Sequence, residues 1–230
     1  MLKAHFMPFI LASALATAQA AQVVSDFENP ALGLDGWTVT GDPAAGSPTR
    51  VATGGNPGGY AEVTDAGLGT VMYWVAPAKF NGDLSVFFDG ALSYDMRQSP
   101  ATSLFQPGAP GDVSISGASD TLVYALPLVV AEYPQSSFTT RTLWLNDQTA
   151  WHLGTTAGPL ATDAQIQSVL GNVTTLRIRA EYSLEIDVNS LDNVMLRDVS
   201  AVPELPSAAL MLGGAALLAG WRARRLKAEG

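Results

Sequence analysis

The sequence contains no cysteine, so disulfide bonds and thiolate metal sites are excluded. Histidine is nearly as scarce, with two residues in 230. Basic residues are few: from Ala21 to Ser200 we count 7 Lys and Arg against 19 Asp and Glu, which gives 7 − 19 = −12. A body of this charge repels nucleic-acid phosphates, and no basic stripe alternates with aromatic residues, so we expect no nucleic-acid partner.

What the sequence does have suits one globular domain between two sorting segments. Hydrophobic residues make up 47% of the chain and charged residues 14%, which is unlike a disordered protein. We divide the chain into residues 1–20, 21–200 and 201–230. The central 180 or so residues are enough for one sizeable core.

The N-terminal segment has the features of a signal peptide. Lys3 precedes an apolar stretch, and Ala18-Gln19-Ala20 fits the small-residue cleavage rule. The sequence therefore predicts cleavage after Ala20 and export of the rest, the alternative being a buried helix of the mature fold.

The C-terminal segment contains a short apolar run from Ala208 to Trp221, followed by the basic residues Arg222, Arg224 and Arg225. As a helix, these 14 residues span about 21 Å, against about 30 Å of bilayer hydrocarbon. The run predicts a short transmembrane helix that is marginal as a permanent anchor. The basic tail keeps its end on the cytoplasmic side and leaves the acidic body outside.

This segment resembles the PEP-CTERM sorting signal, in which a proline-glutamate motif precedes a short apolar helix and an arginine cluster. The motif here reads Val202-Pro203-Glu204-Leu205-Pro206, and Leu205 separates the glutamate from the second proline. The resemblance implies processing by an exosortase after a transient stay in the inner membrane, with the cell surface or extracellular space of a Gram-negative bacterium as the destination. An ordinary tail anchor is the alternative.

Short runs rich in threonine, valine and aromatic residues recur along the body and predict β-strands. We place nine: WTVT at Trp37, YAEVT at Tyr60, TVMYWVAP at Thr70, ALSYDMRQ at Ala91, DVSISG at Asp112, TLVYALPLVV at Thr121, TTRTLWLN at Thr139, TTLRIRAEY at Thr174 and LDNVMLRD at Leu191. Strands without alternating helices predict an all-β sandwich or barrel.

One helix and two loops interrupt these strands. Thr162 and Gln165 form a capping-box pattern, three apolar residues follow at helical spacing, and Gly171 ends the helix. The Gly- and Pro-rich stretches 40–59 and 98–112 predict long surface loops.

No catalytic constellation stands out in the body. His152 is its single histidine, and we interpret it as a turn or core-edge residue. Nucleotide-binding glycine loops, a nucleophile elbow and a zincin motif are all absent from the sequence. A glycosidase-like carboxylate pair remains open among 19 acids, but we expect a protein that is not an enzyme.

The acids near the two ends of the body are candidate calcium ligands. Asp26 and Glu28 are two residues apart, and we expect them on one face of the first strand. Asp192, followed by Asn193, lies on the last strand, which often neighbours the first in a sandwich. Oxygen ligands without histidine or cysteine favour Ca²⁺ over zinc. The alternative is that these acids cap turns or face solvent.

Aromatic side chains offer flat faces for sugar stacking, but about half should face the core. Tyr73 and Trp74 point to opposite faces of a strand, so we expect one of them to be exposed. The sequence alone assigns no aromatic residue to a ligand.

As a whole, the body resembles the laminin B domain, also called laminin domain IV. The similarity rests on SDFENPALGLDGW, GNPGGY, YWVAPAKFNGDLS, ALSYDMRQS, IRAEYS and LDNVML, which follow in the expected order. It implies an antiparallel jelly-roll sandwich related to carbohydrate-binding modules, with a structural Ca²⁺ often held by residues that correspond to Glu28 and Asp192.

These observations predict an exported, non-enzymatic protein that binds extracellular polysaccharide or a matrix component. Two alternatives remain: a structural surface protein without a specific ligand, and a hydrolase of exopolysaccharide.

Overall fold

The structure is a computed structural model that describes residues 20–41, 46–65, 71–99, 111–127, 132–182 and 186–198. All of them belong to one compact unit, Ala20–Ser200. The predicted signal peptide and sorting segment therefore lie outside the described residues, apart from Ala20. No helix of the described ranges is long and apolar enough to span a membrane.

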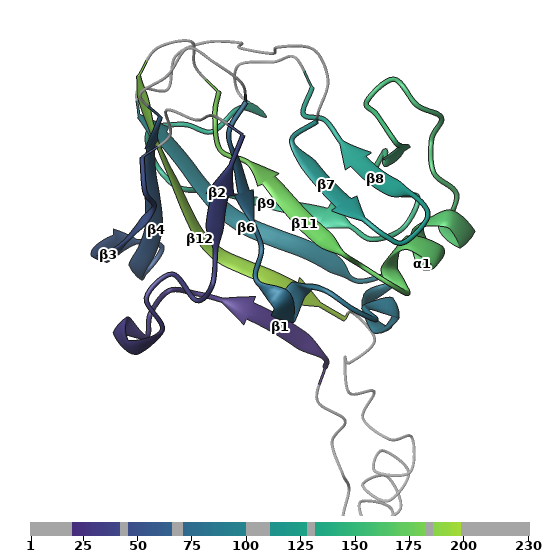
Figure 1. Cartoon of the computed structure of the whole chain (residues 1–230), viewed down its shortest axis with the longest axis horizontal. Helices are drawn as coiled ribbons and strands as arrows, with labels where there is room; N and C mark the ends of the chain where they lie inside the picture. Colours follow the sequence, from purple (N-terminus) through teal and green to yellow (C-terminus); the bar gives the residue numbers. More distant parts are fainter. Residues whose placement is uncertain are drawn as a thin grey trace, which may run out of the picture. The chain divides into compact units, whose positions relative to one another are not determined.

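The described chain folds into two antiparallel sheets (Figure 1), which confirms the predicted β-sandwich. Sheet A has the order β3-β4-β12-β6-β9, and β1 also pairs with β12. Its strands are β1 (Gln22–Ser25), β3 (Thr49–Gly55), β4 (Gly58–Asp65), β6 (Ala91–Ser99), β9 (Thr139–Trp144) and β12 (Asp187–Arg197).

Sheet B has the order β10-β8-β7-β11-β5-β2. Its strands are β2 (Thr38–Thr40), β5 (Tyr73–Val75), β7 (Val113–Ser116), β8 (Thr121–Tyr124), β10 (His152–Leu153) and β11 (Thr175–Arg179). Three short 3₁₀ helices occupy the connections: η1 (Pro30–Leu32), η2 (Ala78–Phe80) and η3 (Ser85–Phe87). All nine runs expected to form strands contain one.

The core lies between the two sheets and contains three of the tryptophans. Trp37, Trp74 and Trp151 expose 1% or less of their surface. Tyr73 and Trp74 are both buried, contrary to expectation, because the hydroxyl of Tyr73 donates to the carbonyl of Gly111 at 3.0 Å. The alternation of side chains along a strand does not by itself predict that both faces of the strand are buried.

The single predicted helix is present as α1 (Asp163–Leu170). Thr162 and Gln165 form the predicted capping box, and Ile166, Val169 and Leu170 are buried. The helix contacts β8 and η3. The apolar spacing therefore identified both the helix and its buried face.

One expectation about loops is wrong, and most of the second predicted loop lies outside the described residues. The stretch 40–59 is not one long loop, because β3 begins at Thr49 and turns at Asn56–Pro57, a cis peptide bond, into β4. At the second predicted loop, β6 continues to Ser99, and residues 100–110 lie outside the described ranges.

The long strand β12 exchanges partners along one of its edges. Residues Asp187 to Leu191 pair with β4, whereas Val194 to Arg197 pair with β1. The register with β6 shifts between Asp192 and Met195, and Asn193 has a positive φ of 48°. This β-bulge re-aims the side chains at the point where one neighbour ends and the other begins.

Candidate functional site

The exchange point on β12 brings together three carboxylates from distant parts of the sequence. Glu28 follows β1, Asp95 lies on β6 and Asp192 lies on β12. We call Glu28, Asp95 and Asp192 the carboxylate cluster. The first and last strands are neighbours, as expected, and the predicted residues Glu28 and Asp192 approach the same turn between β3 and β4.

Asp26 and Glu28 do not lie on the first strand, because β1 ends at Ser25. Phe27 adopts a positive φ of 53°, which breaks the strand alternation. The Oδ1 atom of Asp26 accepts the backbone N–H of Glu28 at 3.1 Å, so Asp26 stabilises its own turn. The structure thus places Glu28, but not Asp26, against the β3–β4 turn.

The turn between β3 and β4, Gly54–Gly58, is built around these acids, and we call it the glycine turn. A Cβ atom on Gly58, whose φ is +72°, would collide with the carboxylate of Glu28. A Cβ atom on Gly55 would lie 2.7 Å from Oδ2 of Asp192. Glycine is therefore required at both positions for steric reasons, which explains the GGNPGG sequence.

Hydrogen bonds from two asparagines hold Asp95 and Asp192, two members of the cluster. The backbone N–H of Asn56 donates to Oδ2 of Asp192 at 2.7 Å, and its side-chain amide donates to Oδ2 of Asp95 at 3.0 Å. Asn193 donates its backbone N–H to Oδ1 of Asp192 at 2.8 Å and its side-chain amide to Oδ2 of Asp95 at 2.8 Å. The amide of Asn193 also donates to the carbonyl of Asn56.

Burial raises the pKa of Asp192 to about 6, and the negative charges of Asp95 and Glu28 act in the same direction. The N–H groups of Asn56 and Asn193 oppose this shift. The surroundings of Asp192 therefore disfavour the negatively charged form of its side chain.

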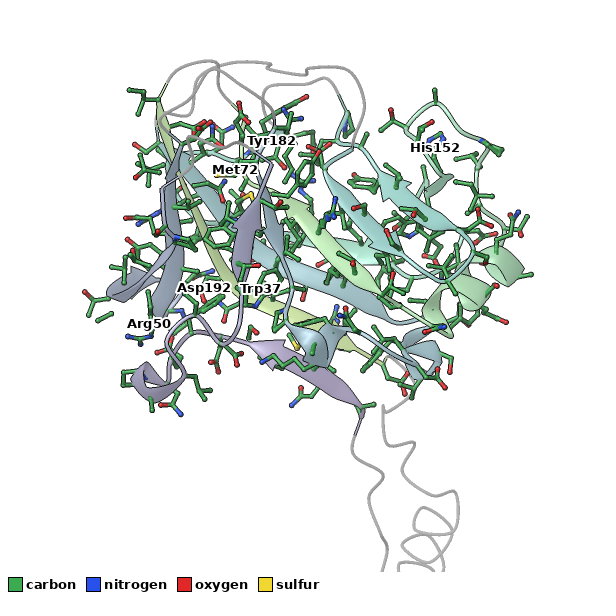
Figure 2. The ribbon with its side chains drawn as sticks, viewed as in Figure 1. Trp37, Arg50, Met72, His152, Tyr182 and Asp192 are labelled. Carbon is green, nitrogen blue, oxygen red and sulfur yellow. The ribbon has the colours of Figure 1, made fainter. Side chains whose placement is uncertain are left out.

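Arg50 fixes the chain on the other side of the glycine turn. Its Nε donates to the carbonyl of Phe27 at 2.6 Å, and its Nη2 donates to the carbonyl of Glu28 at 3.0 Å. Figure 2 shows Arg50 and Asp192 in the lower left of the view, where β3, β4 and the end of β1 meet. Arg50, Asn56 and Asp95 were not identified from the sequence, because their roles depend on contacts between remote strands.

These oxygens partly fit the predicted calcium site. Glu28 and Asp192 supply carboxylates, which are hard ligands of the kind that Ca²⁺ prefers. Across the described residues, however, no three Asp, Glu or His side chains are placed to hold a metal ion. A cation here needs backbone or amide oxygens in addition to the two carboxylates.

Beside the cluster, an arginine lies between two aromatic rings. The guanidinium carbon of Arg97 on β6 is 4.6 Å from the ring centroid of Tyr60 and 4.7 Å from that of Phe138. Its Nη2 donates to the hydroxyl of Tyr60 at 2.6 Å, and Glu62 lies 3.9 Å away. The stack is fixed in position by charge, hydrogen bonds and ring contacts together.

Along β9, alternate residues face away from the core. Leu143 pairs with Leu92 and is buried, so Thr140, Thr142 and Trp144 point outward, with Phe138 directly before the strand. Both threonines are exposed, and both aromatic residues are half-buried. We call Phe138, Thr140, Thr142 and Trp144 the β9 strip.

His152 has a modest role in the structure. Its Nδ1 lies 2.7 Å from the carbonyl of Gly158, and the side chain is half-buried on β10. This agrees with the expectation of a core-edge histidine.

A two-sheet antiparallel sandwich with buried tryptophans in its core defines an all-β sandwich module. The family model described as Laminin B (Domain IV) matches residues 73–210. The chain belongs to the laminin B family.

Comparisons with known proteins agree with this assignment. Laminin subunit gamma-2 of Equus caballus is 33% identical over 135 residues, which cover 57% of this chain and 11% of that protein. The Homo sapiens subunit gives the same values. The chain therefore spans about a tenth of the length of the curated relatives it matches.

Two solved structures resemble the fold. The L4b domain of human laminin alpha-2 is 13% identical, with a TM-score of 0.48, and the match covers 60% of this chain and 80% of that one. A family 11 carbohydrate-binding module from Clostridium thermocellum, in complex with a β-1,3-1,4-mixed-linked tetrasaccharide, is 19% identical with a TM-score of 0.46. That match covers 78% of this chain and 96% of the module.

Proposed function

We propose that this chain is an exported, non-enzymatic surface or extracellular protein whose sandwich binds polysaccharide or a matrix component. Membership of the laminin B family supports a binding module rather than an enzyme. The observation that carries the ligand proposal is the β9 strip, an outward row of side chains suited to an extended sugar chain.

The length and chemistry of the strip suit an oligosaccharide. Phe138 and Trp144 are six residues apart, which corresponds to about 20 Å along a strand. Two exposed threonines, Thr140 and Thr142, lie between them and offer hydroxyl groups. Aromatic faces at both ends and hydrogen-bonding groups in the middle match the alternating apolar and polar surfaces of sugar rings.

Arg97 fixes the orientation of the aromatic ring at one end of the strip. Because its guanidinium lies against the Phe138 ring, that ring is held in place before a ligand arrives. Preorganisation of this kind lowers the entropy cost of binding. Tyr60 is 5% exposed, so it supports the stack and does not itself offer a face to a sugar.

Ca²⁺ is the cation that the carboxylate cluster suits best, with Glu28 and Asp192 as ligands. Bound there, the ion would offset the repulsion between acids that the fold holds close together. Its role in this proposal is structural, because it ties the segment after β1 to β12 at the point where β12 changes partners.

Export and sorting complete the proposal. The signal peptide with Ala18 and Ala20, together with the motif Val202–Pro206, supports transit through the inner membrane and processing by an exosortase. A catalytic role has no comparable support, because Asp95 and Asp192, which lie opposite one another on β6 and β12, are engaged by asparagine N–H groups.

A binding experiment tests the ligand proposal. Purified residues 21–200 are applied to a glycan array and to exopolysaccharide from the source organism, with Trp144→Ala and Phe138→Ala as test variants. We expect each variant to lose about tenfold or more in affinity, in line with the loss of one stacking face.

Leu160→Ala is the matched control, because this residue is apolar, 62% exposed and outside the strip. If both strip variants and the control bound as the wild type does, the ligand would bind to another surface of the domain. Absence of binding by the wild-type chain to any glycan would favour a structural surface protein without a specific ligand.

A further inference from the structure

We infer that the pocket between the turn after β9 and the start of α1 binds a basic sugar residue, so that the glycan held by the β9 strip is one with free amino groups. The inference rests on the polysaccharide proposal above and names the class of sugar. It concerns a part of the surface that belongs neither to the β9 strip nor to the carboxylate cluster.

The pocket is an open hollow with a volume of about 660 Å³, within the range of about 300–1,000 Å³ that small-molecule sites occupy. One wall is the turn 147–151 and the other is the segment 160–164. Trp151 and Ala161, which are buried, line it together with exposed polar side chains. Apolar surface beside a few polar groups suits the mixed character of a sugar ring.

Hydrogen bonds hold the two walls together. The backbone N–H of Ala161 donates to the carbonyl of Trp151 at 2.7 Å, and the N–H of Asp147 donates to Oδ1 of Asp163 at 2.9 Å. The pocket is therefore formed before a ligand arrives, which lowers the entropy cost of binding.

The charge of the pocket selects the kind of sugar. Asp147 and Asp163 line it, and none of the described residues around it is basic. Asp163 is the first residue of α1, where the helix dipole favours a negative charge. A carboxylate has several acceptor positions, so Asp163 can accept a ligand donor while it holds the N–H of Asp147. The pocket thus attracts an ammonium group and repels a carboxylate or sulfate.

The pocket also continues the β9 strip. Oγ1 of Thr149 accepts the backbone N–H of Trp144 at 2.8 Å, and the indole N–H of Trp151 donates to the carbonyl of Trp144 at 2.8 Å. Two residues that line the pocket therefore contact the last residue of the strip. A sugar chain that lies along the strip can place its next residue in the pocket.

The charge of the whole domain acts in the same direction. Residues 21–200 carry 7 basic and 19 acidic side chains, a balance of 7 − 19 = −12. The field of such a domain attracts a polycationic chain from a distance, and salt weakens that attraction. A polysaccharide with free amino groups uses the strip, the pocket and this field, whereas a neutral polysaccharide uses only the strip.

Two oligosaccharides that differ only at the amine test the inference. Residues 21–200 are titrated by calorimetry with the β-1,4-linked hexamer of glucosamine and with that of N-acetylglucosamine, in which acetylation removes the charge. At about pH 6, below the usual pKa of an amine, we expect the free-amine hexamer to bind about tenfold more tightly. This advantage should shrink when salt is raised from about 50 mM to about 500 mM.

Asp147→Asn and Asp163→Asn are the decisive variants, because asparagine keeps the shape and an oxygen acceptor but removes the charge. We expect each to weaken binding of the free-amine hexamer about threefold to fivefold, and that of the acetylated hexamer less than about twofold. Asp120→Asn, at an exposed position between β7 and β8, removes the same charge outside the pocket and should bind like the wild type. Leu160→Ala, in the pocket wall but 62% exposed and uncharged, should do so as well.

The outcomes separate this inference from the polysaccharide proposal. Losses in Asp120→Asn or Leu160→Ala as large as those in the two pocket variants overturn the inference, because net charge or apolar contact would then account for binding. Equal affinity for the two hexamers, or no binding of either by a chain that binds other glycans, overturns it too and leaves the β9 strip standing. Absence of binding to any glycan overturns both.

Discussion

Asn56 and Asp192 are 136 residues apart in sequence, yet the backbone N–H of one donates to the carboxylate of the other at 2.7 Å. This bond joins the turn between β3 and β4 to the last strand of the domain. It explains why a glycine-rich segment, which reads as a loop, is an ordered part of the candidate site.

Replacement of Gly58 by alanine should destabilise the domain by about 3 kcal/mol, because the added methyl group suffers both the positive φ and a collision with Glu28. Gly154→Ala is the control: its φ of +75° is close to that of Gly58, but no atom lies within 4 Å of the added Cβ, so we expect a loss of about 1 kcal/mol. Urea unfolding of both variants measures the difference. Equal losses would mean that the carboxylate of Glu28 does not pack on Gly58 in solution.

Calcium should raise the melting temperature of residues 21–200 by about 5 °C or more at saturating concentration, because the ion binds the folded state. Glu28→Gln should abolish this increase, whereas Asp26→Asn should retain it, since Asp26 is engaged in its own turn. Differential scanning calorimetry with EDTA and with CaCl₂ provides the measurement. If Asp26→Asn lost the response as well, Asp26 would be a ligand after all.

The buried acid Asp112 should make stability depend on pH. Burial raises its pKa, and the N–H of Leu126 and the nearby Arg179 only partly oppose this. A raised pKa means that the folded state holds the proton more tightly, so the stabilisation is complete below the usual value of about 3.9 and is lost as the pH rises through the folded pKa.

Relative to Asp112→Asn, the wild-type free energy of unfolding should therefore fall as the pH rises above about 4, by about 1.4 kcal/mol for each unit of pKa increase. Chemical denaturation at a series of pH values measures it. A constant difference between the two proteins would show that the pKa of Asp112 is the same folded and unfolded.

Removal of the helix cap by Thr162→Ala should cost about 1 kcal/mol, because the side chain accepts the N–H of Gln165 and the pair forms a capping box. Gln167→Ala, at an exposed position of the same helix, should change stability by less than about 0.5 kcal/mol. Thermal denaturation followed by circular dichroism compares them. A cost equal to that of the control would show that the cap is dispensable.

Local sequence patterns predicted much of this fold. Threonine- and valine-rich runs located the strands, and the Thr162–Gln165 spacing located α1 to the residue. These features depend on neighbours within a few positions, so they can be read along the chain. Asp192 was placed on the last strand by local pattern, whereas the pairing of that strand with the first was predicted from the sandwich architecture.

The remainder of the site depends on contacts between remote segments. Asp95 lies in the middle of a predicted strand, and nothing nearby distinguishes it from a surface acid. Glu28 was placed on β1 because alternation gives no sign of the positive φ at Phe27. Gly55 and Gly58 suggested a surface loop, whereas the absence of a side chain at these positions makes room for the carboxylates of Asp192 and Glu28.

The change of partners along β12 has a mechanical consequence. If the protein is retained through its C-terminal end and bound to a matrix through sheet A, as proposed above, tension runs along β12, the strand that carries Asp192. Its hydrogen bonds to β1, β4 and β6 run across the direction of pull, so they resist together in shear and do not open one after another. Under such a load, force would enter the domain at β12, which among the described strands has the most neighbours, and a cation that ties the segment after β1 to β12 would reinforce the joint where two of those neighbours meet.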